Sequence, residues 1–428
     1  MRTTLGKKGA ATAVLAAVLI ALVTGFASGT TPTGGAKAAK TVTLTYFTFS
    51  AAPDHLKDLQ NIINGFQKKY PNIKIKVQTA SYNDYFTKLQ TQIASGQAPD
   101  TFELNYENFV TYASSAKLLN LSKIAKTDRF FNAGVYYPRA YEAFQLKGTQ
   151  YGLPETFSVV LLFYNKDLFR KAGVAFPQAT WKWADELAAA KRLTSGGVFG
   201  DFQPVQFWEF YKVLAQNGGT FFNATKTKAT FNSSQGVAAL NWLLTKTSPE
   251  GVMPTKEQMG GLDDGAMFKA GKLAMWHNGI WQFTGLKDAP FEWDVIVEPG
   301  NVKKAHHFFA NAVVGSAKTK HSREVWTWLR YFTSNPTAVK IRVGNSWELP
   351  AVTNKKLFAL YLKQTPPASR EPVFQALDNI ITPPVIKQQQ QLQDTVGKWL
   401  ERAAAGQVSA AEALNSAASE VNTLLKGE

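Results

Sequence analysis

From residue 41 onward, hydrophobic and polar positions follow two regular spacings in turn. Residues 42–49 are mainly β-branched and aromatic and predict a strand, and residues 101–104 predict another after Pro99. Between them lie a half-buried strand with alternating apolar positions and two helices with apolar positions three and four apart: Ile73, Ile75 and Val77 for the strand, Leu56, Leu59, Ile62, Ile63 and Phe66 for the first helix, and Tyr85, Leu89 and Ile93 for the second. This β-α-β-α-β order predicts a parallel sheet with helices on its faces.

A sheet of this kind binds ligands outside the carboxyl ends of its strands. The first and third strands end at residues 49–51 and 105–107, so we expect a site there. A second α/β unit begins near Tyr164, with helices around residues 182–192, 208–217, 236–244 and 266–270. The chain has 428 residues, of which 45% are hydrophobic and 13% aromatic, so two domains are expected.

The C-terminal part reads as helical. Ser409 and Glu412 form a capping box that opens a final helix, and the glutamine run at 388–391 is expected on a helix as well.

The first residues have the pattern of an export signal. A basic start is followed by an apolar run over residues 10–23, and Ala36-Lys37-Ala38 suits cleavage before Ala39. We therefore expect residues 1–38 to be a signal peptide and the protein to be exported, periplasmic or extracellular, with an uncleaved anchor as the alternative. The chain has no cysteine, and Phe26 stands where a lipoprotein signal would carry its acceptor thiol, so no lipid anchor is expected.

The formal net charge of +16 would suit nucleic acid, an anionic membrane face or an acidic substrate. The lysines are scattered along the chain instead of gathered in runs, which favours a solvated basic surface and no nucleic-acid partner.

Five segments in order resemble family 1 extracellular solute-binding proteins, the class of ABC sugar importers that includes maltose-binding protein. They are the runs FQKKYPNIKIKVQTASYNDYFTKLQTQIASGQAPD from Phe66, YGLPETFSVVLLFYNKDLFRKAGV from Tyr151, FKAGKLAMWHNGIWQF from Phe268, ANAVVGSAKTKHSREVWTWLRYFTS from Ala310 and NSWELPAVTNKKL from Asn345.

The resemblance implies a two-lobed α/β fold in which each lobe is a mainly parallel sheet flanked by helices, with a ligand cleft and a hinge between the lobes. It places residues 39–155 and 310–344 in the first lobe, and residues 156–309 and 345–428 in the second. It implies a monomeric receptor that binds a sugar or oligosaccharide and delivers it to the permease subunits of an ABC transporter. Hinge closure is a known response of such proteins to ligand.

The resemblance also implies the ligand contacts. Matching from Asn217-Gly218-Gly219 makes Trp208 a stacking ring, and matching Asn278-Gly279-Ile280-Trp281 makes Trp281 a second one, with a buried core tryptophan as the alternative. The remaining contacts expected from the match are Phe49, Ser50, Asn105, Tyr106, Glu107, Ser158 and Gln393, the last where the maltose binder has an aromatic ring.

Rival chemistries find less support. A secreted glycoside-active enzyme is the alternative function and needs two carboxyls at a defined separation, but the most visible pair, Asp263 and Asp264, precedes a helix and is expected to cap it. His306 and His307 are adjacent and His55, His277 and His321 isolated, so surface or core roles are expected and no metal site. No nucleotide-binding fingerprint occurs, and we expect no cofactor and no catalytic residues.

Overall fold

The computed structural model describes residues 40–345 and 349–427, and residues 41–428 form one unit. The segment predicted as a signal peptide lies outside the described residues. In the described part of the chain, no helix combines the length and the apolar character that crossing a membrane requires.

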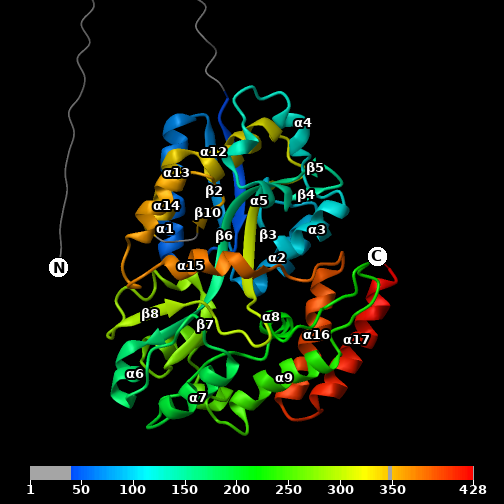
Figure 1. Cartoon of the computed structure of the whole chain (residues 1–428). Coiled ribbons are helices and arrows are strands. Elements are labelled where there is room, and N and C mark those ends of the chain that lie inside the picture. Colours follow the sequence, from blue (N-terminus) through cyan, green and yellow to red (C-terminus); the bar gives the residue numbers. More distant parts are fainter. Residues whose placement is uncertain (1–39, 346–348, 428) are drawn as a thin grey trace, which may run out of the picture. The chain divides into compact units, whose positions relative to one another are not determined.

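The first three strands lie parallel in the order β2, β1, β3, with β1 at Val42–Thr48, β2 at Ile73–Thr79 and β3 at Thr101–Asn105. Helices α1 (Pro53–Lys69) and α2 (Tyr82–Ala94) connect them (Figure 1). The predicted apolar face of α1 is confirmed, since Leu59, Ile62, Ile63 and Phe66 are buried against this sheet. The predicted β-α-β-α-β order is therefore confirmed.

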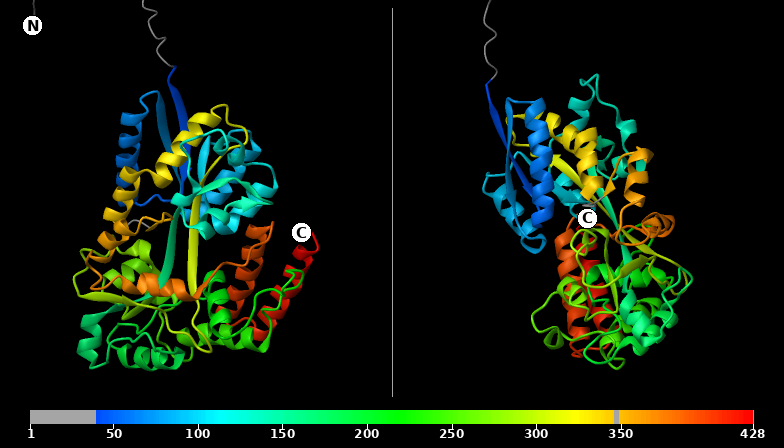
Figure 2. Two further views of the ribbon diagram at one scale, coloured as in Figure 1. Left: turned by 45° about the horizontal axis from the view of Figure 1, so that its top comes forward. Right: turned by 90° about the vertical axis from the view of Figure 1, so that its left-hand side faces the viewer.

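Two long strands continue this sheet and run beyond it. They are β6 (Gly152–Asn165), whose residues are all buried, and β9 (His306–Gly315). β9 is antiparallel to both β3 and β6, and β6 pairs with the short β10 (Leu349–Pro350). Both views in Figure 2 show the two strands passing from the upper to the lower part of this unit.

The lower sheet forms around the second half of β6. Strands β7 (Met275–Gly279) and β8 (Trp293–Ile296) lie on either side of it and are both antiparallel to it. The expectation of a mainly parallel sheet in each lobe is therefore wrong for this one. The hydrophobic pattern indicates that strands exist, but the direction of pairing here is decided by β6, which enters from the upper sheet.

Helices cover the lower sheet and form a separate apolar core on one side of it. In chain order they are α6 (Lys166–Ala172), α7 (Trp183–Leu193), α8 (Phe207–Gln216), α9 (Ser234–Thr247), α10 (Lys256–Met259), α11 (Asp264–Lys269), α16 (Gln389–Ala404) and α17 (Ala410–Leu425). The four predicted helices of this region are thus confirmed, and α17 opens with the predicted capping box between Ser409 and Glu412. α17 packs against α16 and α9 (Figure 1).

The remaining elements surround the upper sheet and the crossing. α12 and α13 pack beside α1, and α14 packs on α13. The division into lobes by residue number stays a prediction. These elements are α3 (Tyr106–Ser114), α4 (Leu121–Ala125), α5 (Pro138–Glu142), α12 (Ser322–Ser334), α13 (Pro336–Asn345), α14 (Lys355–Leu362), α15 (Glu371–Gln375), β4 (Gln145–Leu146), β5 (Thr149–Gln150), β11 (Ile380–Ile381) and the 3-10 turns η1 (Ala133–Val135), η2 (Ile280–Gln282) and η3 (Ala376–Asn379).

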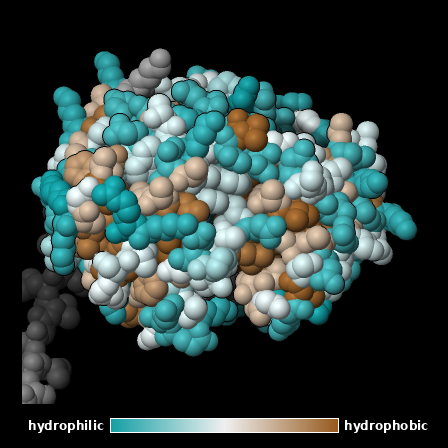
Figure 3. All heavy atoms as spheres, turned by 60° about the horizontal axis from the view of Figure 1, so that its bottom comes forward, coloured by the Kyte–Doolittle hydropathy of each residue, from teal (hydrophilic) through white to brown (hydrophobic). Residues whose placement is uncertain are grey.

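Polar side chains dominate the face of the molecule that Figure 3 shows, and apolar ones form only small separated groups there. This agrees with scattered charge on a solvated surface.

Candidate functional site

A cavity of about 1400 Å³ opens between the two sheets. Its walls come from the carboxyl ends of β1 and β3 on one side, from β6 and β9 at the crossing, and from α8, β7, α11 and the end of α16 on the other. Ligand pockets for drug-sized molecules occupy about 300–1,000 Å³. This cavity therefore has room for more than one small ring.

Seven of the nine predicted contact residues line this cavity: Phe49, Ser50, Asn105, Glu107, Ser158, Trp208 and Trp281. The structure brings them together from five elements and the loops that join them. Phe49, Ser50, Asn105 and Glu107 lie at the strand ends where a site was expected. Whether each contacts a ligand stays a prediction.

Tyr106 and Gln393 do not line the cavity, and a ligand contact for either stays a prediction. Tyr106 opens α3 and packs edge-on against Phe144, with 6.5 Å between ring centroids. Successive helix residues point about 100° apart, so a helix that turns Glu107 into the cavity turns Tyr106 away. Gln393 lies roughly 12 Å along α16 from Glu401, which does line the cavity.

On the upper wall, a buried carboxylate holds the end of β1. Thr48 Oγ1 donates to Glu103 Oε2 at 2.5 Å, and Ser50 Oγ lies 3.4 Å from both Glu103 oxygens. Asn105 caps α3 by accepting from the amide of Asn108, and its Nδ2 donates to the Tyr82 hydroxyl at 3.0 Å. These bonds fix the two strand ends from which the wall is built.

Glu107 is the buried acid of this wall. It is only 3% exposed, and its Oε2 receives no hydrogen bond from any residue that the structure describes. Burial raises the pKa of Glu107 to about 7. The carboxyl can therefore present either a donor or an acceptor to the cavity near neutral pH.

Trp208 and Trp281 lie on the lower side and are half-buried. The Trp208 indole Nε1 donates to Gln206 Oε1 at 2.7 Å, which fixes the plane of the ring. Tyr82 of the upper part lies edge-on to Trp208, with 6.5 Å between centroids. Both tryptophans are outside the fully buried core, which agrees with a cavity role for Trp281 and not with its alternative.

The Trp281 ring lies directly over the backbone of Gly279. A Cβ added at residue 279 would be 2.0 Å from Cζ3 of that ring. Glycine is therefore required here for the position of the indole, not for an unusual backbone angle, since its φ is −91°.

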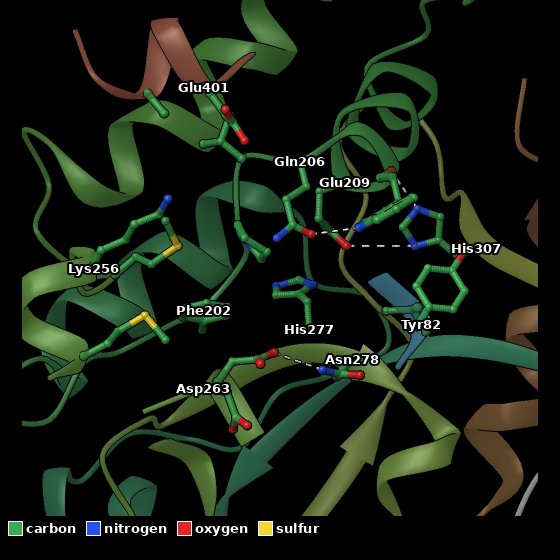
Figure 4. Close-up of a pocket in the computed structure, with 18 of the residues that line it drawn as sticks. Tyr82, Phe202, Gln206, Glu209, Lys256, Asp263, His277, Asn278, His307 and Glu401 are labelled. Atoms are coloured by element: carbon green, nitrogen blue, oxygen red, sulfur yellow. Dashed lines mark hydrogen bonds and ion pairs between the residues drawn. The ribbon is translucent and has the colours of Figure 1, made fainter. Parts of the chain in front are cut away.

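The two acids at the start of α11 have different roles. Asp263 caps the helix by accepting from the Ala266 amide at 2.7 Å, as predicted. Asp264 does not cap it: its Oδ2 accepts from Trp276 Nε1 at 2.8 Å and from Asn278 Nδ2 at 3.1 Å. The second bond is the dashed line that ends at Asn278 in Figure 4. Asp264 thereby fixes β7, the strand that leads into Trp281.

A network of buried charged side chains lies beneath the cavity, and no sequence motif predicted it. Lys246 donates to Glu186, Asp201 and Gln203, and Lys212 donates to Glu298 and to Glu209, the latter at 2.7 Å. Each of these ionised side chains is at most 7% exposed.

His277 joins the two halves of this network. Its Nδ1 lies 2.7 Å from Glu298, and its Nε2 lies 3.3 Å from Glu186 and 3.5 Å from Asp201. Burial by itself would lower the pKa of His277, but Glu186 and Asp201 raise it to about 9. Burial would raise the pKa of Glu186, but Lys246 and His277 lower it to about 2. His277 is therefore a cation and Glu186 a carboxylate at neutral pH.

Two triads in the network have ligand atoms close enough to hold a metal ion: Glu186, Asp201 and His277, and Glu209, His277 and Glu298. In each triad a lysine ammonium already neutralises two carboxylates, Lys246 in the first and Lys212 in the second. The lysines thus fill the place of a cation, and the acids are engaged in structural ion pairs.

The fold and the cavity define a binding protein that holds a solute between two lobes. A family of known proteins, the bacterial extracellular solute-binding proteins, matches residues 52–339. The chain belongs to this family, and its two-lobed fold and its place in the sugar-binding class of ABC importers agree with the sequence interpretation.

Several relatives are named as sugar-binding proteins. A maltotriose-binding protein of Pyrococcus abyssi is 21% identical over 67% of this chain and 62% of its own length, so the match spans less than two thirds of that protein. A multiple sugar-binding protein of Streptococcus mutans is 24% identical over 68% of this chain and 71% of its own. An ABC substrate-binding protein of Listeria monocytogenes, solved in complex with cycloalternan, has 43% identity and a TM-score of 0.88 over 90% of this chain and 99% of its own.

Proposed function

We propose that this receptor binds a cyclic oligosaccharide of the cycloalternan type. The observation that carries the proposal is the likeness, at 43% identity and over nearly the whole of both chains, to the Listeria protein that holds this ligand. The cavity of about 1400 Å³ supports an oligosaccharide over a single sugar.

The cavity walls suit such a ligand. Sugars offer apolar CH faces to aromatic rings and hydroxyls to planar polar groups. Trp208, Trp281, Phe49 and Tyr82 supply the rings. Ser50, Asn105, Glu107 and Ser158 supply polar groups on the upper wall and at the crossing.

Binding proceeds without catalysis. Two carboxylates beneath the cavity, Glu186 and Asp201, are at most 1% exposed and share the Lys246 ammonium. A glycosidase needs its acid and its second carboxylate beside the scissile bond. The acidic pair that does line the cavity is engaged as well, since Asp263 caps α11 and Asp264 accepts from Trp276 and Asn278. The family match is also to binding proteins, so the glycoside-active alternative is not supported.

Calorimetric titration and thermal unfolding with cycloalternan, maltotriose and glucose test the ligand. Cycloalternan is expected to bind tightest and to raise the melting temperature most, because a ligand of the folded state stabilises it in proportion to its occupancy. Intact cycloalternan should be recovered after overnight incubation. Equal responses to all three sugars, or turnover of the ligand, would contradict the proposal.

The proposed function also includes export of the protein and docking on a transporter. We expect the exported chain to begin near Ala39, to remain a monomer, and to dock on the permease subunits of its importer. Mass spectrometry of exported material and size-exclusion chromatography check the first two points. Retention of residues 10–23 in a membrane fraction would overturn the cleavage.

A further inference from the structure

His307 has a fixed tautomer in the lower wall of the cavity. Its Nε2 lies 2.7 Å from the backbone carbonyl of Trp208 (Figure 4). A carbonyl oxygen can only accept, so Nε2 carries the proton. The ring is held in place between Phe309, stacked at 5.2 Å, and Tyr211, edge-on at 5.1 Å.

The other nitrogen of this ring is an acceptor. Burial and the nearby Lys212 ammonium lower the pKa of His307, so the ring is neutral and Nδ1 bears a lone pair. Nδ1 receives no hydrogen bond from any residue within the described ranges. Its nearest charged neighbour, Glu209 Oε1, is 3.9 Å away, which is too far for a hydrogen bond.

Glu209 presents a second acceptor beside it. Lys212 Nζ at 2.7 Å and Gln203 Nε2 at 2.9 Å both bind Oε2 and anchor the carboxylate. Among the described residues no donor binds Oε1, which is turned toward His307 (Figure 4). Both residues line the cavity, and Glu209 follows Trp208 on α8.

These two acceptors lie 3.9 Å apart, and no donor from the described residues binds either of them, so both can accept from a ligand. A sugar ring stacked on Trp208 would bring the hydroxyls of its edge toward the next residue of the same helix. Neighbouring hydroxyls each carry one proton and can each donate to one acceptor at about 2.7–2.8 Å. Carbonyl or carboxylate groups of other solutes would meet only repulsion here.

We propose that Glu209 Oε1 and His307 Nδ1 form a specificity-determining acceptor pair that recognises two adjacent hydroxyls of the bound sugar. The proposal rests on the proposed function and goes beyond the contacts expected from the sequence. Lys212 and Gln203 act as positioning residues, since they hold the carboxylate that the sugar contacts.

Two variants and one matched control test the pair by titration with cycloalternan. Glu209→Gln keeps the size of the side chain and removes the charge. His307→Gln keeps a donor near the position of Nε2 and removes Nδ1. Glu250→Gln makes the same change as the first variant in an acid that pairs with Lys191 at 2.6 Å outside the cavity.

Glu209→Gln should weaken binding roughly 10- to 100-fold, since hydrogen bonds to charged groups contribute about 1.5–3 kcal/mol. His307→Gln should weaken it about three- to tenfold, because its acceptor is neutral. The double variant should lose less than the product of the two factors, because both groups contact one hydroxyl pair. Glu250→Gln should bind like the unaltered protein.

Nitrogen NMR of His307 adds a measurement that a merely structural role would not affect. The free protein should show a neutral ring protonated at Nε2, and cycloalternan should shift the Nδ1 resonance without changing the tautomer. A ring protonated at Nδ1, or variants that bind within twofold of the unaltered protein, would overturn the acceptor pair and leave the proposed function standing. An unaltered protein that binds none of the three saccharides would overturn both.

Discussion

Replacing Lys246 with methionine removes the ammonium that pairs with Glu186 and Asp201 in the buried charge network. Glu186 and Asp201 would then share only His277, at 3.3 Å and 3.5 Å. Both carboxylates are at most 1% exposed, so water cannot replace the lost partner. Breaking a buried ion pair from one side lowers the free energy of unfolding by about 3–5 kcal/mol. That is a large part of the roughly 5–15 kcal/mol that a folded domain has.

The assay is urea unfolding near pH 6, followed by tryptophan fluorescence. Lys191→Met is the matched control, because Lys191 pairs with Glu250 at the half-exposed surface and such pairs contribute less than about 1 kcal/mol. Adding Asp201→Asn to Lys246→Met should restore part of the loss, since it removes one of the two uncompensated charges. Equal losses for Lys246→Met and Lys191→Met would refute the assignment of the network as a buried, ionised structure.

Three further predictions concern the cavity and the pH range. Trp281→Ala should weaken sugar binding roughly thirtyfold or more, because an anchor ring contributes more than about 2 kcal/mol. The urea midpoint should change little, because this ring lies outside the fully buried core. A large stability loss with normal affinity would place the ring in the core. Gly279→Ala should reduce affinity in the same titration while Trp281 is still present, since the new Cβ would lie 2.0 Å from the ring; unchanged binding would show that the ring position is not needed. The raised pKa of His277 contributes stability that is fully present below about pH 6.5 and is lost as the pH rises through about 9. Urea midpoints of the unaltered protein should therefore fall over this pH window, and the fall should be smaller for His277→Gln. Parallel curves for the two proteins would contradict this role of His277.

The sequence was sufficient for the first three strands of the upper sheet and their two helices, because periodicity reports which face of a local element is buried. The apolar positions of α1 and the alternation in β2 depend only on neighbours within a few residues. The direction of the strands in the lower sheet depends on distant residues, since more than 100 residues of chain separate β6 from β7 and β8, with which it pairs. Direction therefore had to come from the structure.

The charge network escaped sequence reasoning for the same reason. The residues of the network form no motif, because Glu186, Lys246 and His277 lie on α7, α9 and β7, and Asp201 and Glu298 lie in two separate loops. One local signal was present: Lys212 interrupts the apolar run of α8, and Lys246 follows Leu243 by three residues on the buried face of α9. A lysine on an apolar helix face indicates a buried partner, but not which one.

Contact residues were predictable where a strand end fixed them and less so on helices. Phe49, Ser50 and Asn105 follow from the carboxyl ends of β1 and β3. Tyr106 and Gln393 do not line the cavity. A helix position is harder to place from sequence because it depends on rotation about the helix axis, which one residue changes by about 100°.

The paired strands β6 and β9 determine how the receptor can move. Two hydrogen-bonded strands resist deformation within the plane of their hydrogen bonds. They bend and twist more easily out of that plane. The ladder shifts register between Pro154 and Thr156, and such irregularities concentrate bending at one crease. We therefore expect bending between the lobes to centre on this irregularity, so that the two strands that line part of the cavity wall also determine where the cavity opens.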